Sequence, residues 1–575
     1  MKLIGTFGIL PLLMGIFYWW HFHPNDMVSR HSAAFPEDRQ NISCSPSDPD
    51  FIWMAGNKFM IPLPGTGNHH YPVSTTNDST QFYFNQGLTM YYSYHFPEAR
   101  GSFREAARFD STAIMAWWGR ALVAGPGYNF VYSYRIQPAI KPVLEKMNSL
   151  LDQAAPKEKA LVWALNQRYQ KLPDHDSVAY FPAEYTAAMK KLSADYPDDA
   201  DIQFLYVDAV MLEHPWNFWR NDGQPQSWTE AVVAVCERAM KMSPEHPAGL
   251  HYYIHLTEAS RQPEVALTAA DKLRLAYPGI AHMVHMSSHE YERNGDYSQG
   301  VEVNKLADRN LVMYDSLFPG FFRVKHASHY WAVQSYCAMS GAMHREAMDA
   351  AMFTRTLLQL SHDNTYDQYL FMLPSFAQVR AGRWAALISD TSVVQADWSY
   401  AKILQAFAKG LAFAHTGELR KARGLLDTCY RYQQDSILYV TDDPTNNLPI
   451  YGARVASGIL EAEILWAGGK RNAAVAAIRR AVATEDSMTY LEPKEWLLPA
   501  RQYLGHYLMV QKKFAEAAAV YREDLQMNPG NGWSALGLSQ ALTARGDRAG
   551  SDSAKVISMR SFGKADHQPP GSVYP

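Results

Sequence analysis

From Phe82 onward, apolar residues recur at the spacing of amphipathic helices. The stretch "FYFNQGLTMYYSYHFPEARGSFREAARFDSTAIMAWWGRAL" places apolar residues three and four positions apart, with small residues where two helices would cross. Asp110 falls between two such stretches, where a turn is expected. The pattern predicts helix-turn-helix units, and we find no alternation of useful length that would indicate a strand.

The same pattern returns near the C-terminus, in "ARQYLGHYLMVQKKFAEAAAVYREDLQMNPGNGWSALGLSQALTARGD". Weaker copies centre on small residues between two amphipathic stretches: Gly295, Gly341, Gly382, Gly417 and Gly468. Over about residues 82–550 the chain resembles the tetratricopeptide family. This resemblance implies an irregular all-α solenoid, a right-handed superhelix of helical hairpins whose first helices line a concave groove.

The pattern divides the chain into five parts. We expect a signal peptide or membrane anchor at residues 1–23, a loop-rich linker or strap at 24–80, tetratricopeptide-like solenoids at 81–360 and 361–550, and a flexible tail at 551–575. Leu3 to Trp20 is an apolar run, which is typical of a targeting segment and predicts export to the periplasm or cell envelope. The strap is rich in Pro, Ser, Asp, Asn and Gly, which favours extended loops.

The amino-acid composition argues against several kinds of binding site. A formal charge of −4 and the lack of a basic run give no indication of nucleic-acid binding. The four cysteines lie far apart and form no C-x-x-C pair, which argues against a thiolate metal site. No phosphate-binding or dinucleotide glycine motif is present, so we expect no nucleotide cofactor. The 21 histidines are the conspicuous chemical resource.

Two pairs of histidines recur one repeat apart. His251 and His255 in "HYYIHLTE" are followed 34 residues later by His285 and His289 in "HMVHMSSHEY". Thirty-four residues is the tetratricopeptide period, so equivalent faces of neighbouring first helices would carry both pairs. Histidines four residues apart on a helix are a common metal-ligand arrangement.

Further candidate ligands surround these four histidines. Glu258 falls on the face of the first pair, and His282 on that of the second. His326 and His329 follow on the next first helix, where His329 is nearly equivalent to His282. The strap could deliver His69 or His70 across the groove. Together these ten residues form the candidate metal site, and the sequence assigns no catalytic residue.

The identity of the metal is less constrained. Imidazole ligands suit copper, iron and zinc, and Met283 and Met286 beside the histidines tilt the choice toward copper. More than four histidines exceed one structural zinc site, so a dicopper or di-iron oxidative centre is one hypothesis. The segment is not H-E-x-x-H, because Tyr252 and Tyr253 follow His251, and a zinc-protease function is therefore disfavoured.

The segments "NHHYPVST", "YFNQGL", "AWWGRALVAGP", "HPAGLHYYIH" and "AHMVHMSSHEY" resemble a group of bacterial exported tetratricopeptide proteins of largely uncharacterised function. In that group the first repeat has Asn-His before Glu-Glu-Ala, whereas this chain has His95-Phe96-Pro97-Glu98-Ala99. The resemblance implies a fold and a site, but no reaction.

Three functions remain open at this stage. The first is metal-dependent chemistry or ligand capture in the groove, so that an enzymatic activity would be metal-dependent. The second is a scaffold that binds a peptide or protein, with the histidines as polar lining and no metal. The third is a pH-sensing groove, because clustered neutral histidines would become charged near pH 6.5. A small molecule or a peptide in the groove, and membrane attachment through the N-terminal segment, are the partners that we expect.

Overall fold

A computed structural model of the chain describes residues 58–137, 139–171, 178–317, 326–441 and 444–575. By its internal contacts the chain divides into two compact units, Met1–Ile42 and Ser43–Pro575, and everything described below belongs to the second. The expected targeting segment and the first part of the strap lie outside the described residues. No helix in the described ranges is both long and apolar enough to span a membrane.

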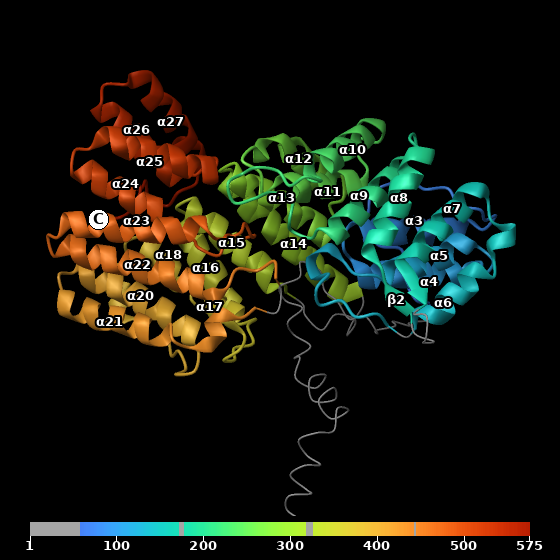
Figure 1. Cartoon of the computed structure of the whole chain (residues 1–575), viewed down its shortest axis with the longest axis horizontal. Helices are drawn as coiled ribbons and strands as arrows, with labels where there is room; N and C mark the ends of the chain where they lie inside the picture. The colour runs from blue at the N-terminus through green and yellow to red at the C-terminus, as the bar shows by residue number, and fades with distance from the viewer. Residues whose placement is uncertain (1–57, 138, 172–177, 318–325, 442–443) are drawn as a thin grey trace, which may run out of the picture. The chain divides into compact units, whose positions relative to one another are not determined.

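The described part of the chain is almost entirely helical (Figure 1). Its first half contains α3 (Asp78–Tyr92), α4 (Phe96–Phe109), α5 (Ile114–Val123), α6 (Ile140–Asn148), α7 (Pro156–Arg168), α8 (Pro182–Asp195), α9 (Ala200–Glu213), α10 (Thr229–Met242), α11 (Pro247–Thr257), α12 (Leu267–Ala276), α13 (Ala281–Arg293) and α14 (Tyr297–Leu317). The short strands β1 (Tyr169–Lys171) and β2 (Val178–Tyr180) pair antiparallel. The sequence pattern did not predict this hairpin.

The second half continues in the same way. It contains α15 (Ser328–Ser340), α16 (His344–Arg355), α17 (Thr365–Phe371), α18 (Leu373–Arg380), α19 (Trp384–Ser389), α20 (Ser399–His415), α21 (Leu419–Tyr432), α22 (Pro449–Ala467), α23 (Arg471–Asp486), α24 (Ala500–Val510), α25 (Phe514–Met527), α26 (Gly532–Ala544) and α27 (Arg548–Ser561). The short 3-10 helices are η2 (Tyr128–Phe130), η3 (Leu151–Gln153), η4 (Pro263–Ala266) and η5 (Ser436–Tyr439).

Consecutive helices pack as hairpins, and each hairpin packs on the next. Helix α13 contacts α14, α14 contacts α15 and α15 contacts α16, and the same succession links α22 through α27. A single helical hairpin cannot bury its apolar face, so stacking of neighbours creates the core. The predicted all-α, tetratricopeptide-like solenoid is confirmed.

Eight of the hairpins share one turn geometry. In each, the second residue of the turn has a positive φ between 56° and 84°, and these residues are Tyr94, Gly295, Ala342, Gly382, Gly417, Gly469, Lys512 and Gly546. Glycine adopts this left-handed conformation without steric cost, which explains its use at five of the eight positions. Tyr94 is the largest side chain among the eight.

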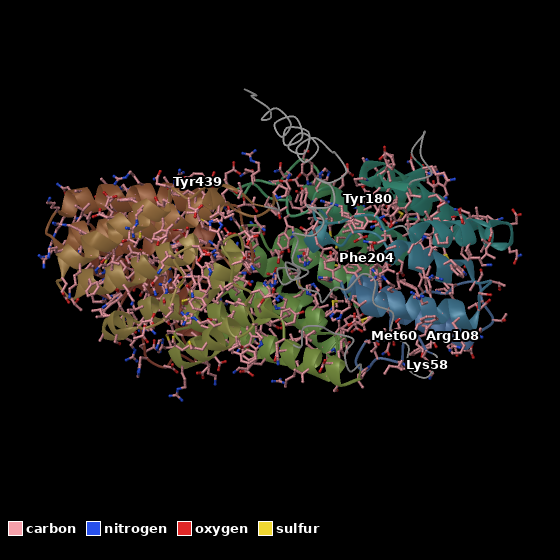
Figure 2. All side chains as sticks on the ribbon, turned by 90° about the horizontal axis from the view of Figure 1, so that it is seen from below. Lys58, Met60, Arg108, Tyr180, Phe204 and Tyr439 are labelled. Atoms are coloured by element: carbon pink, nitrogen blue, oxygen red, sulfur yellow. The ribbon has the colours of Figure 1, made fainter. Side chains whose placement is uncertain are left out.

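The described part of the strap lies on the solenoid. The backbone N–H of Phe59 donates to Glu105 at 2.9 Å, and Met60 is fully buried against Gly101 of α4. Figure 2 shows Lys58 and Met60 beside Arg108 of the same helix. Further along, the carbonyl of Gly65 accepts from the N–H of Gly279 at 3.0 Å, immediately before α13.

The C-terminal residues are folded, in contrast to the flexible tail expected at 551–575. Helix α27 continues to Ser561, and the residues after it pack back onto the solenoid. The Ser572 hydroxyl donates to the carbonyl of Gln502 at 2.9 Å, and Val573 is 7% exposed. The hydrogen bond of Ser572 and the burial of Val573 hold this segment, which the sequence led us to expect as flexible, against the solenoid.

Candidate metal centre

Six histidines come from equivalent positions of three successive first helices. His251 and His255 are the fifth and ninth residues of α11, and His285 and His289 are the fifth and ninth of α13. His282 and His329 are the second residues of α13 and α15. A histidine pair on one helix and the single histidine of the next helix form a triad, and this occurs twice. The first triad is His251, His255 and His282, and the second triad is His285, His289 and His329.

The two triads have matching geometry. In the first triad, the ring centroid of His251 lies 4.9 Å from His255 and 4.8 Å from His282, and the remaining centroid distance is 6.4 Å. In the second triad, the centroid of His285 lies 4.9 Å from both His289 and His329. The ring centroids of His289 and His329 are 6.3 Å apart.

In each triad, one nitrogen from every ring falls within 4.8 Å of the other two, close enough to share one metal ion. The triads adjoin each other, since ring centroids of His255 and His289 are 6.4 Å apart and those of His282 and His285 are 6.0 Å apart. Imidazole nitrogens bound at about 2 Å around a tetrahedral ion lie about 3.3 Å apart. The Nε2 atoms of His251 and His282 are 3.1 Å apart, as are those of His285 and His289.

Hydrogen bonds fix the orientation of four of the six rings. The Nδ1 of His251 lies 2.6 Å from the carbonyl of Tyr92, and that of His285 lies 2.7 Å from Asn304 Oδ1. The Nδ1 atoms of His255 and His289 lie 3.0 and 2.7 Å from the two oxygens of Glu258. Carbonyl and carboxylate oxygens only accept, so each Nδ1 carries the hydrogen and each Nε2 presents its lone pair. Histidine ligands of metals are usually held in this way.

Glu258, predicted as a metal ligand, therefore has another role in this arrangement. It is the C-cap residue of α11, and its two oxygens join one histidine of each triad. Burial by itself raises its pKa, but the neighbouring His255 and His289 lower that pKa to about 2. The carboxyl group is thus an ionised acceptor that aligns the two triads.

Burial also favours the neutral form of several of these histidines. It lowers the pKa of His251, His282 and His285 well below the usual value, and the other histidines add to this effect. Burial lowers the pKa of His329 to about 3. Neutral imidazole is the form that binds metal ions. All six histidines of the triads are buried, whereas the sequence led us to expect them to line a concave groove.

Besides Glu258, three of the predicted ligands lie outside the two triads. The Nδ1 of His326 lies 2.9 Å from Asp308 Oδ1, and His70 is exposed and lies 2.9 Å from the amide nitrogen of Asn85. The Nε2 of His69 lies 3.0 Å from Asp201 Oδ1. Loop placement depends on packing that residue spacing does not encode.

His69, Asp201 and His246 form a separate polar cluster with metal-like spacing. The Nδ1 of His246 accepts from the N–H of Ala248 at 3.2 Å, so its Nε2 carries the hydrogen and faces Asp201 at 3.2 Å. An Nε2–H cannot bind a metal. We therefore interpret this cluster as a hydrogen-bonded attachment of the strap.

Sequence analysis missed several supporting residues. Asn304 sits on α14, and His95 Nε2 accepts from the backbone N–H of His282 at 3.2 Å. Glu492, more than 200 residues away in sequence, lies within 4.8 Å of Glu258 and His289 ligand atoms. Burial and the charge of Glu258 raise the pKa of Glu492 well above its usual value, and these two carboxyl groups and His289 form a further group with metal-ligand spacing. No spacing pattern indicates contacts over such a distance.

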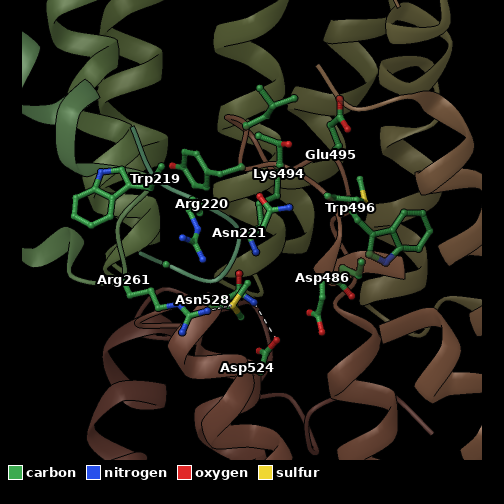
Figure 3. Close-up of a pocket in the computed structure, with 18 of the residues that line it drawn as sticks. Trp219, Arg220, Asn221, Arg261, Asp486, Lys494, Glu495, Trp496, Asp524 and Asn528 are labelled. Carbon is green, nitrogen blue, oxygen red and sulfur yellow. Dashed lines mark hydrogen bonds between the residues drawn. The ribbon is translucent and has the colours of Figure 1, made fainter. Parts of the chain in front are cut away.

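A cavity of about 90 Å³ is lined by residues on either side of the triad helices in sequence, and by none of the six histidines (Figure 3). Trp219, Arg261, Lys494, Trp496 and Asp524 are among its lining residues. Arg293, which also lines it, donates to the carbonyls of Glu258, Ser260 and Met527 at 3.0, 2.8 and 3.0 Å. This guanidinium thus joins the end of α11 to the end of α25.

Comparisons with known proteins give a limited picture. No protein-family model matches the chain, and no curated protein sequence matches it. Similar solved structures include the APC/C hetero-tetramer Cut9-Hcn1, with 11% identity over 85% of this chain and 76% of that one, at a TM-score of 0.27. Human IFIT1 bound to m7Gppp-AAAA has 10% identity over 85% and 91%, at a TM-score of 0.30. Yeast Tom70 has 10% identity over 85% and 90%, at a TM-score of 0.27. Similarity at this level carries no conclusion about what the chain binds or does.

Proposed function

We propose that this chain is a metalloprotein that holds two transition-metal ions, one on each histidine triad, and performs metal-dependent chemistry on a small molecule. The observation that carries the proposal is the repetition of the ligand set. A pair of histidines four residues apart and a third from the next helix occur twice, with the same ring distances. Ordinary polar lining would not need to preserve this geometry across two repeats.

Copper is the metal that we favour. The six donors are imidazole nitrogens, and the carboxylate of Glu258 already accepts from two Nδ1 atoms. Di-iron sites between helices are typically built from carboxylates. Divalent copper binds nitrogen donors more tightly than zinc or ferrous iron does. Three imidazoles leave a coordination position open for an exogenous ligand, which a redox or ligand-capture function requires.

Elemental analysis of protein purified from its native compartment without chelators tests the proposal. We expect about two equivalents of metal per chain, with copper dominant, in line with one ion per triad. Zinc at both positions would retain the dinuclear site but remove the redox chemistry. Less than stoichiometric transition metal after purification and after reconstitution would overturn the proposal.

The cavity in Figure 3 favours a second function, capture of a small molecule or short peptide. Its wall combines tryptophan faces with basic and acidic side chains, which suits a ligand that carries both charge and apolar surface. Equilibrium dialysis against a peptide library, with Trp496→Ala as the cavity variant, tests this function. Binding that is unaffected by the substitution would exclude the cavity as the site.

We also propose that residues 1–23 export the chain or anchor it in the cell envelope, on the strength of their apolar run. Fusion of this segment to a reporter that is active only outside the cytoplasm tests the proposal. A cytoplasmic reporter would contradict it.

A further inference from the structure

Tyr94 occupies a backbone position that glycine fills in most other hairpins. It is the second residue of the turn between α3 and α4, with φ at 56°, and five of the seven equivalent positions carry glycine. A side chain in the left-handed region is disfavoured, and a bulky one especially so. Strained residues of this kind tend to be found at functional sites.

The ring of Tyr94 lies against all three histidines of the first triad. Its centroid is 4.5 Å from that of His251, 5.6 Å from that of His282 and 5.8 Å from that of His255. The side chain is 1% exposed. Its hydroxyl group has no hydrogen-bond partner among the described residues.

The neighbours of Tyr94 also contact the first triad. The carbonyl of Tyr92 accepts from His251 at 2.6 Å, and His95 accepts from the backbone N–H of His282 at 3.2 Å. The turn therefore holds the triad at three points, and the left-handed conformation places the Tyr94 ring between the other two. If residue 94 adopted the right-handed helical conformation instead, this turn would not form.

Leaving a buried hydroxyl group without a partner is unfavourable, and a ligand at the site would remove that penalty. We propose that the Tyr94 hydroxyl donates a hydrogen bond to a small oxygen- or nitrogen-donor ligand, such as water, hydroxide or a small anion, bound at the open position of the first triad. The inference rests on the proposed metal centre. The second triad has a different aromatic neighbour, since Tyr330 of α15 stacks on His285 with ring centroids 4.2 Å apart.

Azide titration of the copper-loaded protein tests this inference, because azide binds open positions on transition-metal ions and produces a charge-transfer band. We expect Tyr94→Phe to retain about two metal ions and to bind azide about tenfold more weakly, the effect of one lost hydrogen bond. Tyr128→Phe is the matched control, since its ring lies 5.0 Å from that of His255 but its hydroxyl accepts from the N–H of Trp216. The control should bind azide like the unmodified protein.

A second variant tests the Tyr94 ring instead of its hydroxyl group. Tyr94→Gly keeps the turn that glycine already forms elsewhere, and we expect it to retain both metals and to bind azide faster because one wall of the site is gone. Unchanged azide affinity in Tyr94→Phe, loss of one metal from that variant, or an unchanged rate in Tyr94→Gly would each overturn the inference. An unmodified protein that binds no metal would instead refute the proposed function itself.

Discussion

The Nε2 atoms of His285 and His289 lie 3.1 Å apart, although the Nδ1 of each ring already donates to an acceptor. In the neutral rings both Nε2 atoms carry lone pairs, which repel at this distance unless a cation lies between them. Burial lowers the pKa of His285 well below its usual value, so a proton is a poor candidate for that cation. This short contact therefore supports the metal ion that we propose on the second triad.

Replacing His289 should remove one metal ion. We expect His289→Ala to bind about one equivalent instead of two, because the second triad loses a ligand and two imidazoles hold a metal weakly. Elemental analysis of the purified variant measures this change. The control is His70→Ala, another histidine expected from the sequence to be a ligand but exposed in the structure, and it should retain both ions. Equal metal loss in the two variants would contradict the assignment.

Replacing Glu258 should weaken both sites at once. In Glu258→Gln only one atom of the amide accepts, so one of the two Nδ1–H groups loses its acceptor and faces a donor instead. Loss of such an outer hydrogen bond typically lowers metal affinity 10- to 100-fold, and competition with a chelator of known affinity measures it.

Glu463→Gln is the matched control for this substitution. Glu463 is 5% exposed, lies 3.1 Å from His415 and accepts from the Tyr507 hydroxyl at 2.6 Å, so it resembles Glu258 away from the triads. We expect its metal affinity to be unchanged. A similar loss in both variants would indicate a general effect on the fold.

Two glycines at the same turn position should differ in their tolerance of alanine. Gly295→Ala and Gly417→Ala both place a Cβ at positive φ, which costs about 1–2 kcal/mol. A Cβ on Gly295 would also meet the carbonyl oxygen of Gly530 at 2.2 Å, whereas Gly417 has open space. We expect Gly295→Ala to be destabilised by about 1–3 kcal/mol more than Gly417→Ala. Chemical denaturation of the two variants measures the difference, and equal losses would contradict the close approach.

Asp208 should make stability depend on pH. Burial raises its pKa to about 6, despite the hydrogen bond it accepts from Tyr91 at 2.7 Å. The unfolded carboxyl group ionises near its usual value of about 3.9, so between these values the folded state binds more protons and stability falls as the pH rises. The stability of the unmodified protein relative to Asp208→Asn should fall by about 2 kcal/mol from about pH 4.5 to 7.

Denaturation of the metal-free forms of both proteins at each pH checks this prediction. Both retain the same histidines, so their titration cancels in the comparison. A difference that stays constant with pH would show that Asp208 is ionised in the folded state.

Local patterns in the sequence predicted the helical hairpins and the histidines of the two triads. Helical periodicity is local, so spacing alone placed His251 with His255, and His285 with His289, on single helix faces. The repeat period then related the two faces, and similar distances to the next repeat glycine, Gly341 and Gly295, related His329 to His282. These inferences needed only the geometry of one helix and the length of one repeat.

The contacts that each candidate residue makes depend on long-range packing. Glu258 became the acceptor that joins His255 and His289, because its oxygens lie 3.0 and 2.7 Å from their Nδ1 atoms. His69 was drawn to Asp201 by the path of the strap, and Tyr94 was placed over the first triad by a left-handed turn. Side-chain direction and long-range packing depend on contacts between residues far apart in the chain, which periodicity does not encode.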